Sequence, residues 1–126
     1  MTHNKVIDLV PRLAFVAAIV CAIVIAFLSL LPGDELPSQN LNDKLNHVIA
    51  YGVLTGLAVV GRGSWSLLWV MVLATGYGAL LEVLQGVMPY GRSASTLDAL
   101  ANTAGVFIGG FLGFCGQAVL ERIHRA

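Results

Sequence analysis

The sequence predicts an all-α membrane protein, a bundle of four transmembrane helices with short loops, and two observations carry that prediction. Of the 126 residues, 57% are hydrophobic and only 11% are charged. The charged residues leave four long uncharged runs, at residues 13–33, 45–61, 63–81 and 99–120. About 20 apolar residues cross a bilayer as a helix, so each run is close to one span in length. We expect a single domain over residues 1–126.

The first helix is expected from about Leu13 to Leu31, ending at Pro32-Gly33. Its apolar stretch is longer than the ~7–15 residues of a secretory signal, and no A-x-A-like site follows, so we expect it to remain as an anchor. Cys21, in this run, and Cys115, in the last run, both fall at mid-membrane depth. We interpret them as small packing residues rather than as a disulfide or a metal pair.

The other three helices follow from capping and turn signals. The second is expected to open at Asn40 or Asn42, which are good N-caps. The third is expected over about residues 65–85. The segment Ser95-Thr96-Leu97-Asp98 resembles a capping box, which predicts the start of the fourth helix. That helix ends in basic residues, which suit a helix C-terminus.

The basic residues predict the orientation. Four crossings place five of them on one side, namely Lys5, Arg12, Arg62, Arg122 and Arg125, and leave Lys44 and Arg92 on the other. Cytoplasmic loops carry the excess of Lys and Arg, so both termini are expected in the cytoplasm. The predicted location is the cytoplasmic (inner) membrane, as a multi-pass protein. Seven basic and seven acidic residues balance, and this gives no argument for a nucleic-acid partner.

Polar side chains gather at the predicted outer ends of the second, third and fourth helices. Helical spacing puts each group on one face of its helix, and an ionisable residue in a span usually faces the interior and has a partner. We therefore expect a ligand-binding cluster of Asp43, Lys44, His47, Tyr51, Glu82, Gln85, Arg92, Asp98 and Asn102. Two alternatives stay open: Tyr51 anchors at headgroup level, or Glu82 reaches water instead of pairing with Arg92, Lys44 or His47.

Glycines continue the polar stripe of the fourth helix. Gly105, Gly109 and Gly113 recur every four residues, and Gly52 and Gly56 offer a complementary surface on the second helix. In lipid, close backbone approach at small residues drives helix association. We expect the fourth helix to pack centrally. The same glycine face also offers a surface for oligomerisation.

Two other kinds of site are weighed and set aside. Asp43, His47, Glu82 and Asp98 are metal-ligand types, but the sequence has no HExxH motif, no cysteine pair and no second histidine in a span. We therefore predict no metal and no cofactor. A hydrolase built from Ser93 or Ser95 with His47 and Asp98 lacks a nucleophile elbow.

Three strings, DKLNHVIAY, EVLQGVMPYGR and DALANTAGVFIGG, together with Ser29 and Pro32, resemble the VanZ-like family of small membrane proteins. The resemblance covers about residues 27–113. The family's namesake lowers susceptibility to teicoplanin, a lipoglycopeptide that acts on cell-wall precursors outside the cytoplasmic membrane. The resemblance therefore implies a cell-envelope location and a theme of antibiotic resistance, but it implies no reaction.

The expected function is binding of a membrane lipid or a lipid-linked cell-envelope precursor. Lys44, Arg92 and His47 would contact an anionic headgroup through charge-assisted hydrogen bonds. One alternative is an enzyme on a lipid-linked substrate, with His47 and Glu82 or Asp98 as general acid and base. Another is a structural scaffold for a partner membrane protein.

Overall fold

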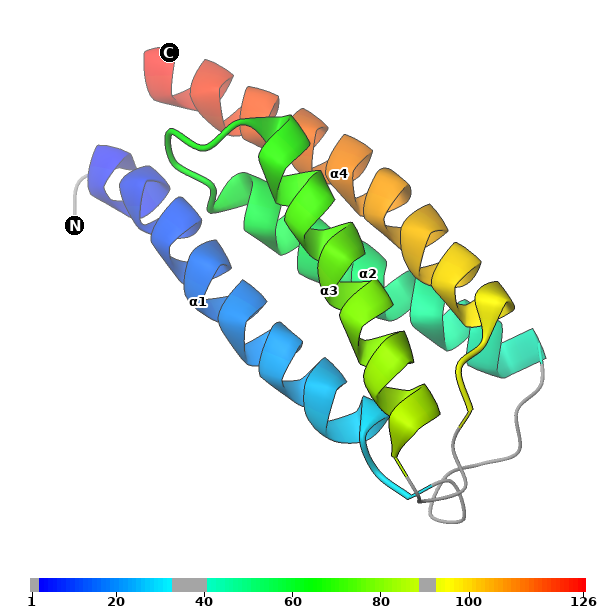
Figure 1. Cartoon of the computed structure of the whole chain (residues 1–126). Coiled ribbons are helices and arrows are strands. Elements are labelled where there is room, and N and C mark those ends of the chain that lie inside the picture. Colours follow the sequence, from blue (N-terminus) through cyan, green and yellow to red (C-terminus); the bar gives the residue numbers. More distant parts are fainter. Residues whose placement is uncertain (1–2, 33–40, 89–92) are drawn as a thin grey trace.

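The computed structural model describes residues 3–32, 41–88 and 93–126. Within these ranges the chain forms four α-helices and no strand. They are α1 (His3–Ser29), α2 (Leu41–Val60), α3 (Leu67–Val87) and α4 (Thr96–Arg125). The helices run alternately up and down, so both termini lie at one end of the bundle (Figure 1). The end of α1, the start of α2, the end of α3 and the start of α4 share the opposite end, where the polar residues lie.

Three helices are long and apolar enough to cross a membrane: Lys5–Ser29, Leu67–Val87 and Thr96–Arg125. The sequence predicted four such helices. The polar start of α2, with Asp43, Lys44 and His47, lowers the hydropathy of that helix. A fourth crossing therefore remains a prediction.

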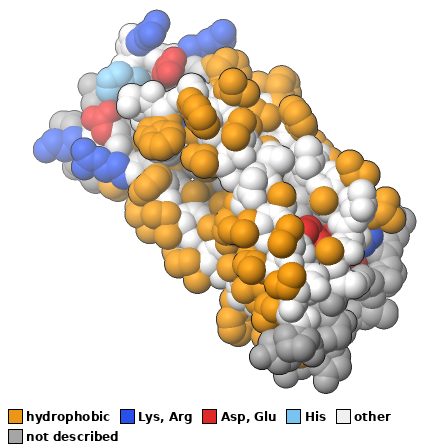
Figure 2. Space-filling model, in the orientation of Figure 1, with side chains coloured by type: hydrophobic (Ala, Val, Ile, Leu, Met, Phe, Trp, Pro, Cys, Tyr) orange, Lys and Arg blue, Asp and Glu red, His pale blue; other side chains and the backbone are white. Residues whose placement is uncertain are grey.

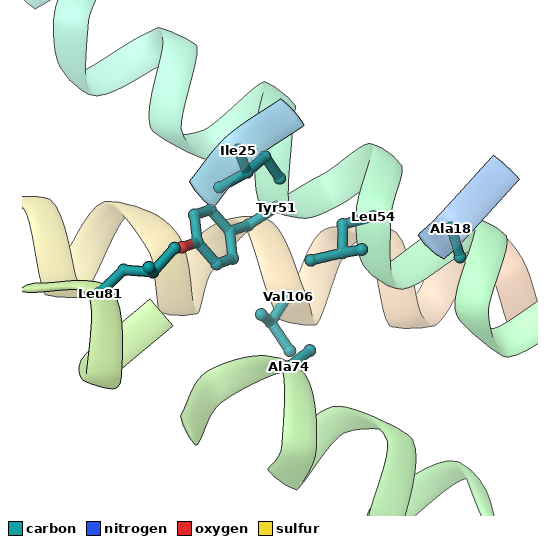
Figure 3. Close-up of a cluster of buried hydrophobic side chains, with 7 residues drawn as sticks. All are labelled: Ala18, Ile25, Tyr51, Leu54, Ala74, Leu81 and Val106. Atoms are coloured by element: carbon teal, nitrogen blue, oxygen red, sulfur yellow. The ribbon is translucent and has the colours of Figure 1, made fainter. Parts of the chain in front are cut away.

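The position of α2 explains how it tolerates these polar groups. It packs against all three other helices and most extensively against α4. Tyr51, Leu54, Thr55 and Val59 of α2 are buried. Figure 3 shows Tyr51 and Leu54 among Ala18 and Ile25 of α1, Ala74 and Leu81 of α3 and Val106 of α4. A helix covered on most sides meets protein rather than lipid, so its polar residues find partners inside the bundle.

The backbones of α2 and α4 meet at glycine, as the sequence predicts. A Cβ added at Gly105 would lie 2.5 Å from the Val48 carbonyl oxygen, and one at Gly113 would lie 2.8 Å from the Gly56 carbonyl oxygen. At Gly109 a Cβ would lie 2.8 Å from Gly52 Cα. Only glycine permits this approach. The face considered for oligomerisation is therefore covered by α2 of the same chain.

The outer surface is an apolar belt. Large hydrophobic side chains are exposed on every helix, including Phe15 and Phe27 on α1, Val83 on α3, and Phe107 and Phe111 on α4. Figure 2 shows one face of this belt, with most of the visible Lys and Arg at the end that carries the termini. A soluble monomer rarely exposes so much contiguous apolar surface, so the belt is suited to lipid.

One boundary prediction is wrong. α1 begins at His3 rather than near Leu13, and Pro11 lies inside it. An uncharged run measures the apolar stretch and not the helix, and Lys5, Asp8 and Arg12 continue the helix beyond that stretch. Proline removes one intrahelical hydrogen bond, and the structure places this loss in the third turn.

Candidate functional site

The polar end of the bundle is built around the first turns of α2 and α4. The Ser95 hydroxyl caps α4 by accepting from the Asp98 backbone N–H at 3.2 Å, which confirms the predicted cap. Close packing of α2 on α4 then brings Asp43, Lys44 and His47 beside Asp98 and Asn102. We call these five residues the α2–α4 polar network.

Ion pairs hold the first part of this network. The Lys44 ammonium donates to Asp98 Oδ1 and lies 3.6 Å from Asp43 Oδ2. The Asp98 side chain is only 4% exposed, whereas Lys44 and Asp43 are 27% and 28% exposed. The network therefore has a buried carboxylate at its centre and a partly open rim.

His47 connects the two helices through both ring nitrogens. Its Nδ1 lies 2.7 Å from Asn102 Oδ1. Since an amide oxygen only accepts, Nδ1 carries the hydrogen in this contact. Nε2 lies 3.8 Å from Asp43 Oδ2 and also 3.8 Å from Asp98 Oδ2. The imidazole thus has a fixed orientation, with Nε2 toward two carboxylates.

Glu82 and Gln85 of α3 bind the backbone of neighbouring segments. Glu82 Oε2 accepts from the Ser95 N–H at 3.0 Å, at the residue that caps α4. Gln85 Nε2 donates to the Ser29 carbonyl at 2.7 Å, at the last residue of α1. Both side chains are buried. They join the end of α3 to α1 and α4, an arrangement that stabilises the polar end of the bundle.

Tyr51 and Arg92 are the two remaining candidate residues. Tyr51 is buried in the hydrophobic core, with 2% of its surface exposed, so it is not an anchor at headgroup level. Arg92 lies outside the described residues, and its pairing with Glu82 stays a prediction. Of the nine candidate residues, five form the α2–α4 polar network, and Glu82 and Gln85 bond α3 to its neighbours. Tyr51 packs in the hydrophobic core, and Arg92 is the one candidate outside the described residues.

Sequence reasoning missed two contacts of α3 with backbone carbonyl groups of α1. Ser29 contributes a carbonyl group to Gln85, and Tyr77 donates from its hydroxyl to the Ala22 carbonyl, which ties α3 to α1. Backbone acceptors carry no sequence signal. Asp43, His47 and Asp98 also bring three possible metal-ligand atoms within 4.8 Å of one another. The sequence already offers these three residues as metal-ligand types, and we predicted no metal because no local motif accompanies them.

One cavity of the described residues lies away from the polar network. Its volume is about 460 Å³, and it opens between Ile7 and Pro11 of α1 and Leu120 and Glu121 of α4, at the end with the termini. The polar network consists of bonded side chains, and its rim at Lys44 and Asp43 is partly exposed. A ligand of this site would bind at the rim, where Lys44 and Asp43 are open to solvent.

Three comparisons bear on the relatives of this chain. No protein-family model, no curated protein and no solved structure matches it. The resemblance to VanZ-like proteins consequently rests on the three strings alone, and function has to be argued from the residues themselves.

Proposed function

We propose that this chain is a four-span protein of the cytoplasmic membrane, and that its extracytoplasmic end binds the anionic headgroup of a lipid or lipid-linked cell-envelope precursor. Three apolar helices and the apolar belt support the membrane location. The five basic residues near the end with the termini support a cytoplasmic position for that end. The polar network then lies at the outer surface.

The observation that carries the proposal is the difference in exposure across the network. Asp98, only 4% exposed, holds an ammonium group whose own side chain is 27% exposed. An ammonium has three donors, so an incoming phosphate or carboxylate oxygen can bind Lys44 while Asp98 keeps it in place. The buried acid thus positions a cation at the rim.

The flank of α2 suits the apolar part of such a ligand. Leu45, Ile49 and Val53 are exposed and recur every four residues, starting next to Lys44. This spacing forms one stripe along the helix. A fatty acyl or prenyl chain bound by its headgroup at Lys44 would run down this stripe, beside the bulk lipid.

Lipid retention tests the proposal. The protein is purified in mild detergent, and native mass spectrometry measures the bound lipid in Lys44→Gln and in the matched control Lys5→Gln, at the opposite end. We expect the first variant to lose the lipid and the second to keep it. Lys44→Arg, which keeps a positive charge, should retain most of the lipid. Equal retention in Lys44→Gln and Lys5→Gln would refute headgroup binding at the network.

A second candidate function is structural, because the network joins the helices to one another. Lys44 and His47 of α2 bond to Asp98 and Asn102 of α4. Removing one partner of a buried ion pair typically costs ~3–5 kcal/mol. If the polar end only holds the bundle together, Lys44→Gln lowers the melting temperature strongly and the parent protein carries no lipid. The same preparations therefore separate the two functions.

A further inference from the structure

Three side chains of metal-ligand type converge from two helices within the α2–α4 polar network, between its buried centre and its rim. His47 Nε2 lies 3.8 Å from one carboxylate oxygen of Asp43 and 3.8 Å from one of Asp98. One ligand atom from each residue lies within 4.8 Å of the other two. A triangle with two sides of 3.8 Å and a third of at most 4.8 Å has its centre no more than about 2.5 Å from each corner, within a few tenths of an ångström of the bond lengths of zinc to oxygen and nitrogen.

The orientation of His47 gives a second argument. Its Nδ1 is engaged with Asn102 Oδ1 at 2.7 Å, which leaves Nε2 facing the two carboxylates. A metal-bound histidine almost always donates its other ring N–H to a carbonyl or carboxylate, which fixes the tautomer. An Nε2 without a hydrogen and two carboxylates all accept, and a cation placed between them would satisfy all three.

In the structure that cation is the Lys44 ammonium. It contacts Asp98 and lies 3.6 Å from Asp43 Oδ2, the same oxygen that faces His47. Two carboxylates thus share one ammonium at a partly open rim. Lys44 has a long flexible side chain and is 27% exposed, so it can turn outward when another cation enters.

We propose that Asp43, His47 and Asp98 bind one divalent transition-metal ion, Zn²⁺ or Mn²⁺, in competition with the Lys44 ammonium. Two oxygens and one imidazole nitrogen suit these ions better than Mg²⁺ or Ca²⁺, which prefer oxygen alone. Water completes the coordination at the rim. This site goes beyond lipid binding and does not depend on it.

Metal titration tests the site directly. The full chain, purified without a histidine tag, is stripped with EDTA and titrated with ZnCl₂ or MnCl₂ by calorimetry, with no lipid added. We expect one ion per chain, and no comparable binding of Mg²⁺. His47→Gln and Asp98→Asn should each lose binding of Zn²⁺ and Mn²⁺. Asn102→Leu, which removes only the partner of Nδ1, should weaken binding about 10- to 100-fold. His124→Gln, at the opposite end, is the matched control.

Lys44→Met gives the sharpest test because its expected effect has the opposite sign. Without the competing ammonium, the metal should bind more tightly than in the parent. The metal-free Lys44→Met variant should also melt at a lower temperature than the parent. Addition of Zn²⁺ should raise its melting temperature back toward that of the parent. The double variant Lys44→Met/Asp98→Asn should show no such recovery.

Several results would overturn the site. The first is an absence of binding in both the parent and Lys44→Met. The second is binding that persists in His47→Gln and Asp98→Asn, which would place the ion elsewhere. The third is a Lys44→Met variant that metal neither binds nor stabilises. EDTA removes metal from the protein, so lipid retention measured in EDTA tests headgroup binding alone. Failure of the metal site can therefore be distinguished from failure of headgroup binding.

Discussion

Gly109→Ala adds one methyl group where the backbones of α2 and α4 meet. An ideal Cβ at this position would lie 2.8 Å from both the carbonyl carbon and the Cα atom of Gly52, and closer still to its oxygen. Ordinary contact begins at about 3.4 Å. The two helices would therefore have to move apart locally by at least about 0.6 Å, because a backbone cannot rotate away as a side chain can.

The loss of stability in Gly109→Ala can be estimated from this displacement of the two helices. A gap of 0.5–1 Å already forfeits a quarter to a half of the dispersion energy of each atom pair along the interface. Overpacking of this kind costs ~1–3 kcal/mol. Replacing glycine by alanine within a helix returns roughly 0.5–1 kcal/mol through lower backbone entropy. We expect a net loss of about 1–2 kcal/mol in the free energy of unfolding.

Gly116→Ala is the matched control on the same helix. A Cβ there would lie 3.9 Å from its nearest neighbour, Val60 Cγ2, which is ordinary contact. We expect this variant to be as stable as the parent or slightly more stable. Unfolding in detergent, followed by tryptophan fluorescence, measures both variants. If Gly109→Ala melts at the same temperature as Gly116→Ala, the close contact of α2 and α4 is wrong.

Three further expectations follow. Ser95→Ala removes the cap of α4 and should lower stability by ~1 kcal/mol, whereas Ser93→Ala, exposed before the helix, should not; equal melting temperatures would contradict the capping role. Gln85→Met keeps the length of the side chain but deprives the last carbonyl of α1 of its donor, and should cost ~1–3 kcal/mol in a denaturant titration; an unchanged midpoint would show that water replaces the amide. Reporter fusions at Ser38 and Ala126 should give opposite readings, with the reporter at Ala126 in the cytoplasm, and matching readings would exclude an odd number of crossings between these sites.

The sequence predicts the helices well because each depends on local rules. Uncharged runs locate the apolar parts of all four, and the hydroxyl of Ser95 marks the start of α4. The repeat of Gly105 and Gly109 predicts a closely packed helix, because only glycine allows backbones to meet. The start of α1 was not predictable in this way, since an uncharged run ends at the first charged residue, whereas the helix continues through Lys5, Asp8 and Arg12.

The candidate site was predictable as a set of residues but not as an arrangement. Spacing puts Asp43 and His47 on one face of α2, and the helix order brings them to the same end as Asp98. Which α2 groups meet which α4 groups depends on the rotation of each helix about its axis, and this is set by the glycine contact. Gln85 shows the limit: its partner is a carbonyl group of α1, which no side-chain pattern reveals.

The separation of α2 from α4 along the chain has a consequence for biogenesis. In the proposed four-span arrangement, α2 is the helix that composition alone does not mark as a span, and its Lys44 and His47 bond to Asp98 and Asn102, made about fifty residues later. During synthesis α2 emerges before those partners exist. We expect α2 to stay at the insertion machinery, or beside α1, until α4 is made. Truncation before α4 should leave α2 outside the bilayer, so this small protein completes its insertion only with its last helix.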